Sequence, residues 1–67
     1  MNRDRLEGNW KQLKGRVRSK WGEITDDEVQ QLKGNYEELQ GVIQERYGYT
    51  RERAEQELND WLDTEQA

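Results

Sequence analysis

The six glycines of this chain form two triplets with the same internal spacing. Within each triplet the glycines are seven residues apart, and the second triplet follows the first after 26 residues: Gly8, Gly15 and Gly22, then Gly34, Gly41 and Gly48. Other residues repeat at the same interval, since Leu13 corresponds to Leu39. Seven residues make about two turns of an α-helix. The pattern therefore predicts an internal duplication of one small helical unit, with repeats at about residues 8–33 and 34–62.

The apolar residues are few, but their spacing argues against disorder. Of the 67 residues only 30% are hydrophobic and 39% are charged, a balance typical of disordered chains. In the first repeat, however, apolar side chains recur at steps of three and four residues, as on one helix face: Leu6, Trp10, Leu13, Val17, Trp21 and Ile24. The second repeat has a similar series from Tyr36 to Tyr47. We expect one all-α domain over residues 1–67, with four short helices packed as two helical hairpins.

Glycines and capping residues mark the expected helix ends. Gly22 is expected to end the first helix and Gly48 the third, because glycine adopts the left-handed C′ conformation without a steric penalty. Thr25 and Glu28 are spaced as a capping box at the start of the second helix. Thr50 is expected to open the fourth helix. The inner face of that helix carries four apolar residues: Ala54, Leu58, Trp61 and Leu62.

The junction between the second and third helices has two interpretations. Gly34 is a stop signal and Asn35 is a good N-cap, which together favour a break. The apolar series from Val29 to Ile43 also fits one long helix bent at Gly34, and the chain has no proline to forbid it. We favour the break, because a glycine inside a helix costs about 1 kcal/mol relative to alanine.

Gly15 and Gly41 lie inside predicted helices, on the face opposite the apolar stripe. Glycine is unfavourable there by about 1 kcal/mol relative to alanine, so its presence needs an explanation. Either these are tolerated surface positions, or another helix approaches the backbone closely. That second helix could belong to the same fold or to a second copy of the chain.

Charge is distributed unevenly along the chain, whose net charge is −4. Residues 1–22 hold seven basic and two acidic residues, whereas residues 23–67 hold four basic and thirteen acidic ones. Lys11, Lys14 and Arg18 share one flank of the first helix, where we expect them to follow the core edge and pair with acidic helices. The polarity also favours head-to-tail self-association. Nucleic acid is disfavoured as a partner, because most of the chain would repel phosphate.

Two tyrosines flank the stop at Gly48. Tyr47 is expected in the core and Tyr49 between the third and fourth helices, with ring edges available to a partner. The charged flank, the inner glycines and this second tyrosine define a candidate interaction surface: Lys11, Lys14, Gly15, Arg18, Gly41 and Tyr49.

Residues that support catalysis or metal binding are scarce. The chain has no histidine and no cysteine, so it lacks the commonest general base, the commonest metal ligand and any thiolate. Ser19 is the only serine, and no histidine can activate it. The acidic run from Asp26 to Glu28 cannot converge on one ion, because successive helical residues point about 100° apart. We expect no enzyme activity, no cofactor, no metal and no small-molecule substrate.

Four short segments carry a family resemblance: Gly8-Asn9-Trp10-Lys11-Gln12-Leu13-Lys14-Gly15, Trp21-Gly22, Thr25-Asp26-Asp27 and Gln44-Glu45-Arg46-Tyr47-Gly48-Tyr49. Together they resemble the CsbD-like family of small bacterial stress proteins, from about Asn9 to Trp61. The resemblance implies a bacterial cytoplasmic protein made under general stress, with a SAM-domain-like arrangement of two hairpins. It implies no catalytic or ligand residues. Tyr36-Glu37 departs from the family pattern, in which a basic residue is expected before the acid.

The expected function is that of a non-enzymatic stress-response protein that binds a protein partner or a second copy of itself. One alternative is a hydrophilic protectant of other proteins under osmotic or desiccation stress, which the high charge and low hydrophobicity favour. DNA binding through the first helix is a weaker alternative. The start of the sequence has no apolar stretch, so we expect neither a signal peptide nor a membrane partner.

Overall fold

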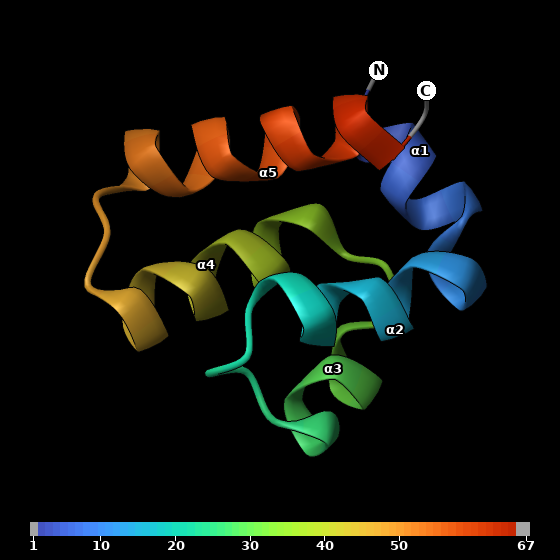
Figure 1. Ribbon diagram of the computed structural model, residues 1–67, viewed down its shortest axis with the longest axis horizontal. Coiled ribbons are helices and arrows are strands. Elements are labelled where there is room, and N and C mark those ends of the chain that lie inside the picture. Colours follow the sequence, from blue (N-terminus) through green and yellow to red (C-terminus); the bar gives the residue numbers. More distant parts are fainter. Residues whose placement is uncertain (1, 66–67) are drawn as a thin grey trace.

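Five helices contain most of the residues that the structure, a computed structural model, describes, namely 2–65 (Figure 1). They are α1 (Asn2–Gly8), α2 (Trp10–Lys20), α3 (Asp26–Leu32), α4 (Tyr36–Tyr47) and α5 (Arg51–Glu65). Residues 2–65 contain no strand, so the all-α prediction is confirmed. The predicted number of four helices is wrong by one.

The additional helix arises from a break at Gly8 and Asn9, where the apolar stripe predicts one continuous helix. Asn9 leaves the helical conformation, with φ −115° and ψ 18°. Its backbone N–H donates to the carbonyl oxygen of Arg5 at 3.0 Å, and its side-chain amide donates to the same oxygen at 3.1 Å. An asparagine side chain can compete with the helix backbone in this way. The two bonds complete the end of α1 and allow α2 to take a new direction.

The break between α3 and α4 is confirmed. Lys33 and Gly34 both adopt left-handed conformations, with φ 51° and 82°. Asn35 then caps α4, because its side-chain oxygen accepts a hydrogen bond from the N–H of Glu38 at 3.0 Å. The alternative of one long helix through Gly34 is therefore wrong.

The two other predicted helix stops have different outcomes. Gly48 ends α4 as expected, with φ 70° and an N–H that donates to the carbonyl oxygen of Gln44 at 2.9 Å. Gly22 is not the expected left-handed stop: α2 ends at Lys20 with Trp21 as its C-cap residue, and the glycines with positive φ are Gly34 and Gly48. The C-cap residue Trp21 is buried, with only 2% of it exposed, and its N–H donates to the carbonyl oxygen of Val17 at 2.8 Å.

The expected start of α5 is confirmed at Thr50. Its hydroxyl oxygen accepts a hydrogen bond from the N–H of Arg53 at 3.1 Å, as an N-cap residue does. All four residues of the apolar inner face predicted for this helix are buried: Ala54, Leu58, Trp61 and Leu62.

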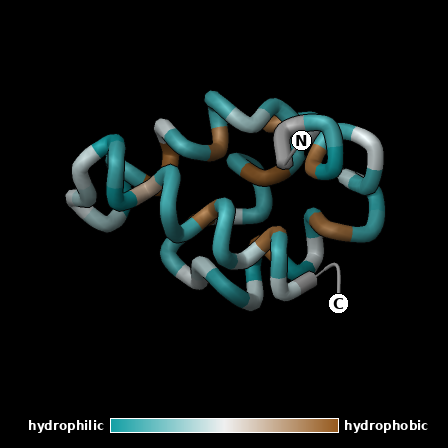
Figure 2. Tube along the Cα trace, turned by 90° about the horizontal axis from the view of Figure 1, so that it is seen from above, coloured by the Kyte–Doolittle hydropathy of each residue, from teal (hydrophilic) through white to brown (hydrophobic). Residues whose placement is uncertain are grey.

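Buried side chains from all five helices and the α2–α3 loop form one hydrophobic core: Leu6, Leu13, Val17, Trp21, Ile24, Val29, Leu32, Tyr36, Leu39, Ile43, Ala54, Leu58, Trp61 and Leu62. Figure 2 shows that hydrophobic stretches of the chain are short and are separated by hydrophilic ones. Helix α2 packs against α3 and α4 against α5, while α1 contacts α2, α4 and α5. The internal duplication and the SAM-domain-like arrangement stay predictions.

Helices α2 and α5 lie on different sides of the core. In Figure 1, α5 runs along one edge of the molecule, and the pair α2 and α3 lies across α4 from it. The ring of Trp21, at the end of α2, meets the ring of Trp61 of α5 edge to face, with centroids 5.1 Å apart. The outward faces of α2 and α5 therefore lie on different sides of the molecule.

Candidate interaction surface

Every charged side chain of α2 is basic: Lys11, Lys14, Arg16, Arg18 and Lys20. The helix buries Leu13 and Val17 in the core, which turns the residues between them outward. Positions three, four and seven residues apart are neighbours on a helix surface. Four of the predicted site residues therefore lie together, and we call them the basic face of α2: Lys11, Lys14, Gly15 and Arg18.

The cations of the basic face differ in their partners. Arg18 is half-buried, and its guanidinium forms an ion pair with the carboxylate of Asp26 at the start of α3. Lys11 and Lys14 are exposed and form no ion pair with any residue between 4 and 64. The expected pairing with acidic helices thus holds for Arg18 alone of the three. The two lysines are left available to another molecule.

Gly15 and Gly41 are exposed on different helices, α2 and α4. A Cβ added at either position would meet no atom within 4 Å. Close approach by another helix of the same fold is therefore ruled out as the reason for these glycines. Approach by a second copy stays a prediction, and Gly41 lies outside the basic face of α2.

Gly34 is the glycine that the fold approaches closely, which the sequence did not indicate. A Cβ there would lie 3.1 Å from the Cβ of Trp10 and 3.2 Å from the Cα of Glu7. The junction of α1 and α2 thus packs directly on the junction of α3 and α4. The only available signal was the position of Gly34 between two capping residues, which explains a turn but predicts no contact.

Tyr49 lies in the loop between α4 and α5, as predicted, and is half-buried. Its ring centroid is 5.4 Å from that of Tyr47, and the guanidinium of Arg53 lies 4.4 Å from its centroid. Tyr47, predicted for the core, is half-buried, and its hydroxyl oxygen accepts a hydrogen bond from the N–H of Glu23 at 3.2 Å. Stacking and the cation cover part of the Tyr49 ring, which belongs to the α4–α5 loop and not to α2.

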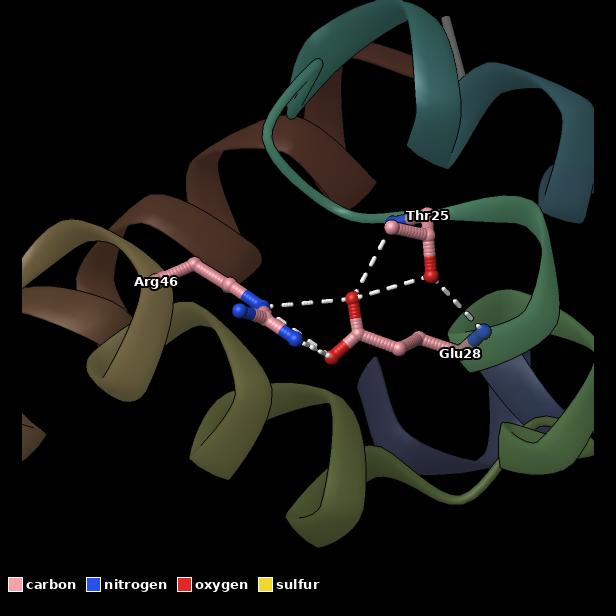
Figure 3. Close-up of polar contacts among 3 residues, drawn as sticks. All are labelled: Thr25, Glu28 and Arg46. Atoms are coloured by element: carbon pink, nitrogen blue, oxygen red, sulfur yellow. Dashed lines mark hydrogen bonds and ion pairs between the residues drawn. The ribbon is translucent and has the colours of Figure 1, made fainter.

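The start of α3 combines the predicted capping box with an ionic contact that the sequence did not predict (Figure 3). The predicted capping box forms: the N–H of Glu28 donates to the Thr25 hydroxyl oxygen at 3.2 Å, and the Thr25 N–H donates to the Glu28 carboxylate at 3.0 Å. Arg46 of α4 also reaches this carboxylate, with its Nη2 2.6 Å from Oε2. Nothing in the sequence spacing linked Arg46 to Glu28, which is 18 residues away.

These bonds change the protonation equilibrium of Glu28. The side-chain hydrogen bond from Arg46 lowers the pKa of the carboxyl below its ordinary value of 4.5, and the backbone hydrogen bond from Thr25 adds to the effect. The same pair raises the pKa of Arg46. One carboxylate therefore both caps α3 and joins it to α4.

The outward side of α5 carries several carboxylates. The sequence analysis gave the acidic excess of residues 23–67 but did not place it on this helix. Four exposed side chains of α5 lie together, and we call them the acidic face of α5: Glu52, Glu55, Gln56 and Asp60. Arg53, also exposed on α5, places its guanidinium over the Tyr49 ring. A hollow of about 330 Å³ opens among the side chains of the acidic face and Asn59. The three carboxylates form no ion pair within the described part of the chain.

Neither metal-ligating clusters nor membrane-spanning helices occur in the described part of the chain. No three carboxylates there are grouped so that they could hold a metal ion. No helix between residues 2 and 65 is long and apolar enough to cross a membrane.

The fold and these surfaces define a small all-helical protein with separate basic and acidic faces. The model of the CsbD-like family matches residues 4–56, and the chain belongs to that family, as the resemblance predicted. It is 51% identical over 63 residues to the UPF0337 protein PA4738 of Pseudomonas aeruginosa, covering 94% of this chain and 97% of the relative. It is also 51% identical over 61 residues to the UPF0337 protein YjbJ of Escherichia coli, covering 91% and 88%. No solved structure matches significantly.

Proposed function

We propose that this protein is a non-enzymatic interaction module of the bacterial stress response, whose basic face of α2 docks on an acidic protein surface. The proposal rests on the exposure of Lys11 and Lys14 and on their lack of ion-pair partners within residues 4–64. Both lysines lie on a helix that has no acidic residue. A concentrated positive surface on a protein of net charge −4 steers an acidic partner to one place and one orientation.

The remaining surface supports a non-enzymatic role. A hollow of about 490 Å³ lies beside the α3–α4 junction, with Glu7, Lys33 and Glu38 among its lining residues. Catalytic nucleophiles are normally activated by an adjacent base, and this hollow has no serine, cysteine or histidine in its lining. Family membership and the CsbD-like name support a stress-related role. A cytoplasmic location is part of the same proposal.

A binding assay with an acidic probe tests the proposal. Fluorescence anisotropy of labelled poly-L-glutamate at low salt should show binding to the wild-type protein. The double substitution Lys11→Gln/Lys14→Gln should weaken that binding by about tenfold, because two unpaired charges of the face are lost.

The matched control is Lys20→Gln/Lys33→Gln, which changes the net charge equally. Lys20 lies beside the Trp21 ring, 6.0 Å from its centroid, and Lys33 follows α3. Equal loss of binding in the two double variants would show that only net charge matters, and the proposal would then fail. Absence of binding by the wild type would have the same consequence.

A second candidate function, a hydrophilic protectant of other proteins, is favoured by the composition. Mean hydropathy is −1.49, and most side chains outside the core are exposed and polar. Such protection depends on the whole surface, so Lys11→Gln/Lys14→Gln should leave it unchanged. Light scattering of a heated client enzyme separates the two functions: suppression of aggregation by wild type and variant alike favours the protectant, and no suppression by either removes it.

A further inference from the structure

We infer that the acidic surface recognised by the basic face of α2 is the acidic face of α5 on a second copy of the same chain. The inference rests on the proposed function, because it names the partner of that face. Each copy has both faces, so copies join head to tail.

The two faces cannot satisfy each other within one molecule. Helices α2 and α5 lie on different sides of the core (Figure 1). Each buries its apolar residues in that core, so the exposed charged residues of the two helices lie on different sides of the molecule. The contact between the two helices runs through the buried rings of Trp21 and Trp61. The lysines of one face and the carboxylates of the other have no ion pair within residues 4–64. Only another molecule can complement them.

The two faces match in spacing and shape. Lys11 and Lys14 are three residues apart, as are Glu52 and Glu55, so both pairs span about 4.5 Å along their helices. The hollow among the α5 carboxylates is open to a lysine side chain from outside. Beside the lysines, Gly15 has open space where a side chain would project, which lets a second helix come close. Contact with a second copy thus gives Gly15 a role, whereas nothing within a single copy requires a glycine there.

The arrangement predicts a weak assembly that is sensitive to salt. A contact between different faces leaves one face free at each end, so it generates open chains rather than closed dimers. One helix against another buries less than the roughly 800 Å² per partner of stable complexes. Exposed ion pairs are screened as the ionic strength rises. Association should therefore grow with protein concentration and decrease with salt, whereas an apolar contact would not weaken with salt.

Sedimentation equilibrium of two complementary variants tests the inference. At about 50 mM salt the wild type, with a monomer mass of 8.1 kDa, should reach masses beyond the dimer, and about 500 mM salt should weaken association by about tenfold. Lys11→Gln/Lys14→Gln, which loses the basic face, and Glu52→Gln/Glu55→Gln, which loses the acidic face, should each be monomeric. Their equimolar mixture should form a dimer and nothing larger, because each variant retains one face that fits the other.

Two control variants carry the same charge changes elsewhere. Lys20→Gln/Lys33→Gln and Glu7→Gln/Glu45→Gln should self-associate like the wild type, and circular dichroism should show that all four variants are folded. A mixture of the two face variants that stays monomeric overturns the inference, as does a wild type that stays monomeric at millimolar concentration and low salt.

Failure of this inference is distinguishable from failure of the proposed function. If the wild type remains monomeric but binds poly-L-glutamate through Lys11 and Lys14, the basic face has a different protein partner. If a single-stranded oligonucleotide binds the wild type through these lysines and poly-L-glutamate does not, the partner is a nucleic acid and both proposals are overturned.

Discussion

Two glycines of the same repeated pattern have opposite structural roles. Gly41 is exposed in the middle of α4, with no atom within 4 Å of the place a Cβ would occupy. Gly34 is buried, has φ 82°, and lies against the backbone of Glu7 and the side chain of Trp10. Regular spacing in the sequence therefore does not imply a common reason for the residue. Substitution by alanine separates the two cases.

Gly41→Ala should stabilise the protein. Alanine fits the open helical position and reduces the conformational freedom of the unfolded chain, so the free energy of unfolding should rise by about 0.5–1 kcal/mol. Urea unfolding followed by circular dichroism measures this change. A decrease instead would mean that the open space beside α4 is occupied, by a second copy for example.

Gly34→Ala should destabilise the protein by about 2–3 kcal/mol. The left-handed conformation costs a residue with a Cβ about 1–2 kcal/mol, and contacts of 3.1 and 3.2 Å force the α1–α2 junction to move. Gly48→Ala is the matched control, since Gly48 has φ 70° but open space around it. Urea unfolding should show a smaller loss for the control. Equal losses would contradict a role for the contact with Trp10 and Glu7.

At the scale of elements, Glu28 joins α3 to α4. Its carboxylate accepts hydrogen bonds from the Thr25 N–H and from the Arg46 guanidinium (Figure 3). The cap fixes where α3 begins, and the ion pair fixes where α3 lies relative to α4. A single protonation weakens both.

Stability should therefore decrease in acid partly through Glu28. Its folded-state pKa lies below 4.5, so its contribution is fully present above the unfolded-state pKa and is lost as the pH falls through the folded-state pKa. Glu28→Gln should lower the free energy of unfolding at pH 7, and the difference from the wild type should shrink toward pH 3. Urea unfolding across this range measures it, with Asp27→Asn as the control for charge at the start of α3. A constant difference between wild type and Glu28→Gln would contradict the assignment.

The elements that the sequence predicted well are those defined by short-range chemistry. Caps at Thr25, Asn35 and Thr50 depend on bonds within one helical turn, and all three form. The break at Asn9 was missed because its side chain bonds backward to Arg5, while the apolar period continues across it. The contact of Arg46 with Glu28 was missed because it depends on how α3 and α4 pack. Spacing along one chain carries no such information.

The candidate interaction surface was likewise predicted only in the part that depends on residues of a single helix. The adjacency of Lys11, Lys14, Gly15 and Arg18 followed from helical spacing alone. Whether each cation had a partner depended on the position of α3, and only Arg18 proved to have one. Gly41 and Tyr49 lie on other elements, so a shared surface with the lysines could not be predicted from spacing.

At the scale of the whole molecule, α5 completes the core although the family match ends at residue 56, inside that helix. Leu58, Trp61 and Leu62, beyond that point, are buried. The ion pair of Arg5 with Asp63, at 3.7 Å, also joins α1 to α5. The family match thus leaves out part of the core that α5 completes.

A chain shortened to residues 1–56 should therefore not fold cooperatively. Removing three buried side chains of this size forfeits about 5–9 kcal/mol of hydrophobic stabilisation, which is comparable to the whole stability of a small domain. Thermal unfolding followed by circular dichroism should lack a sigmoidal transition. Residues 1–64 are the control and should retain one. A cooperative transition in the shorter chain would show that α1 to α4 form an independent core.

The contact between Trp21 and Trp61 also gives the protein an optical property. Two of its three indoles lie in one buried contact between the end of α2 and α5, and the third, Trp10, is half-exposed beside Gly34. Indole emission moves to longer wavelength when water reaches the ring. The colour of the native fluorescence therefore reports whether α5 is docked, so the chain carries its own probe of its integrity without any added label.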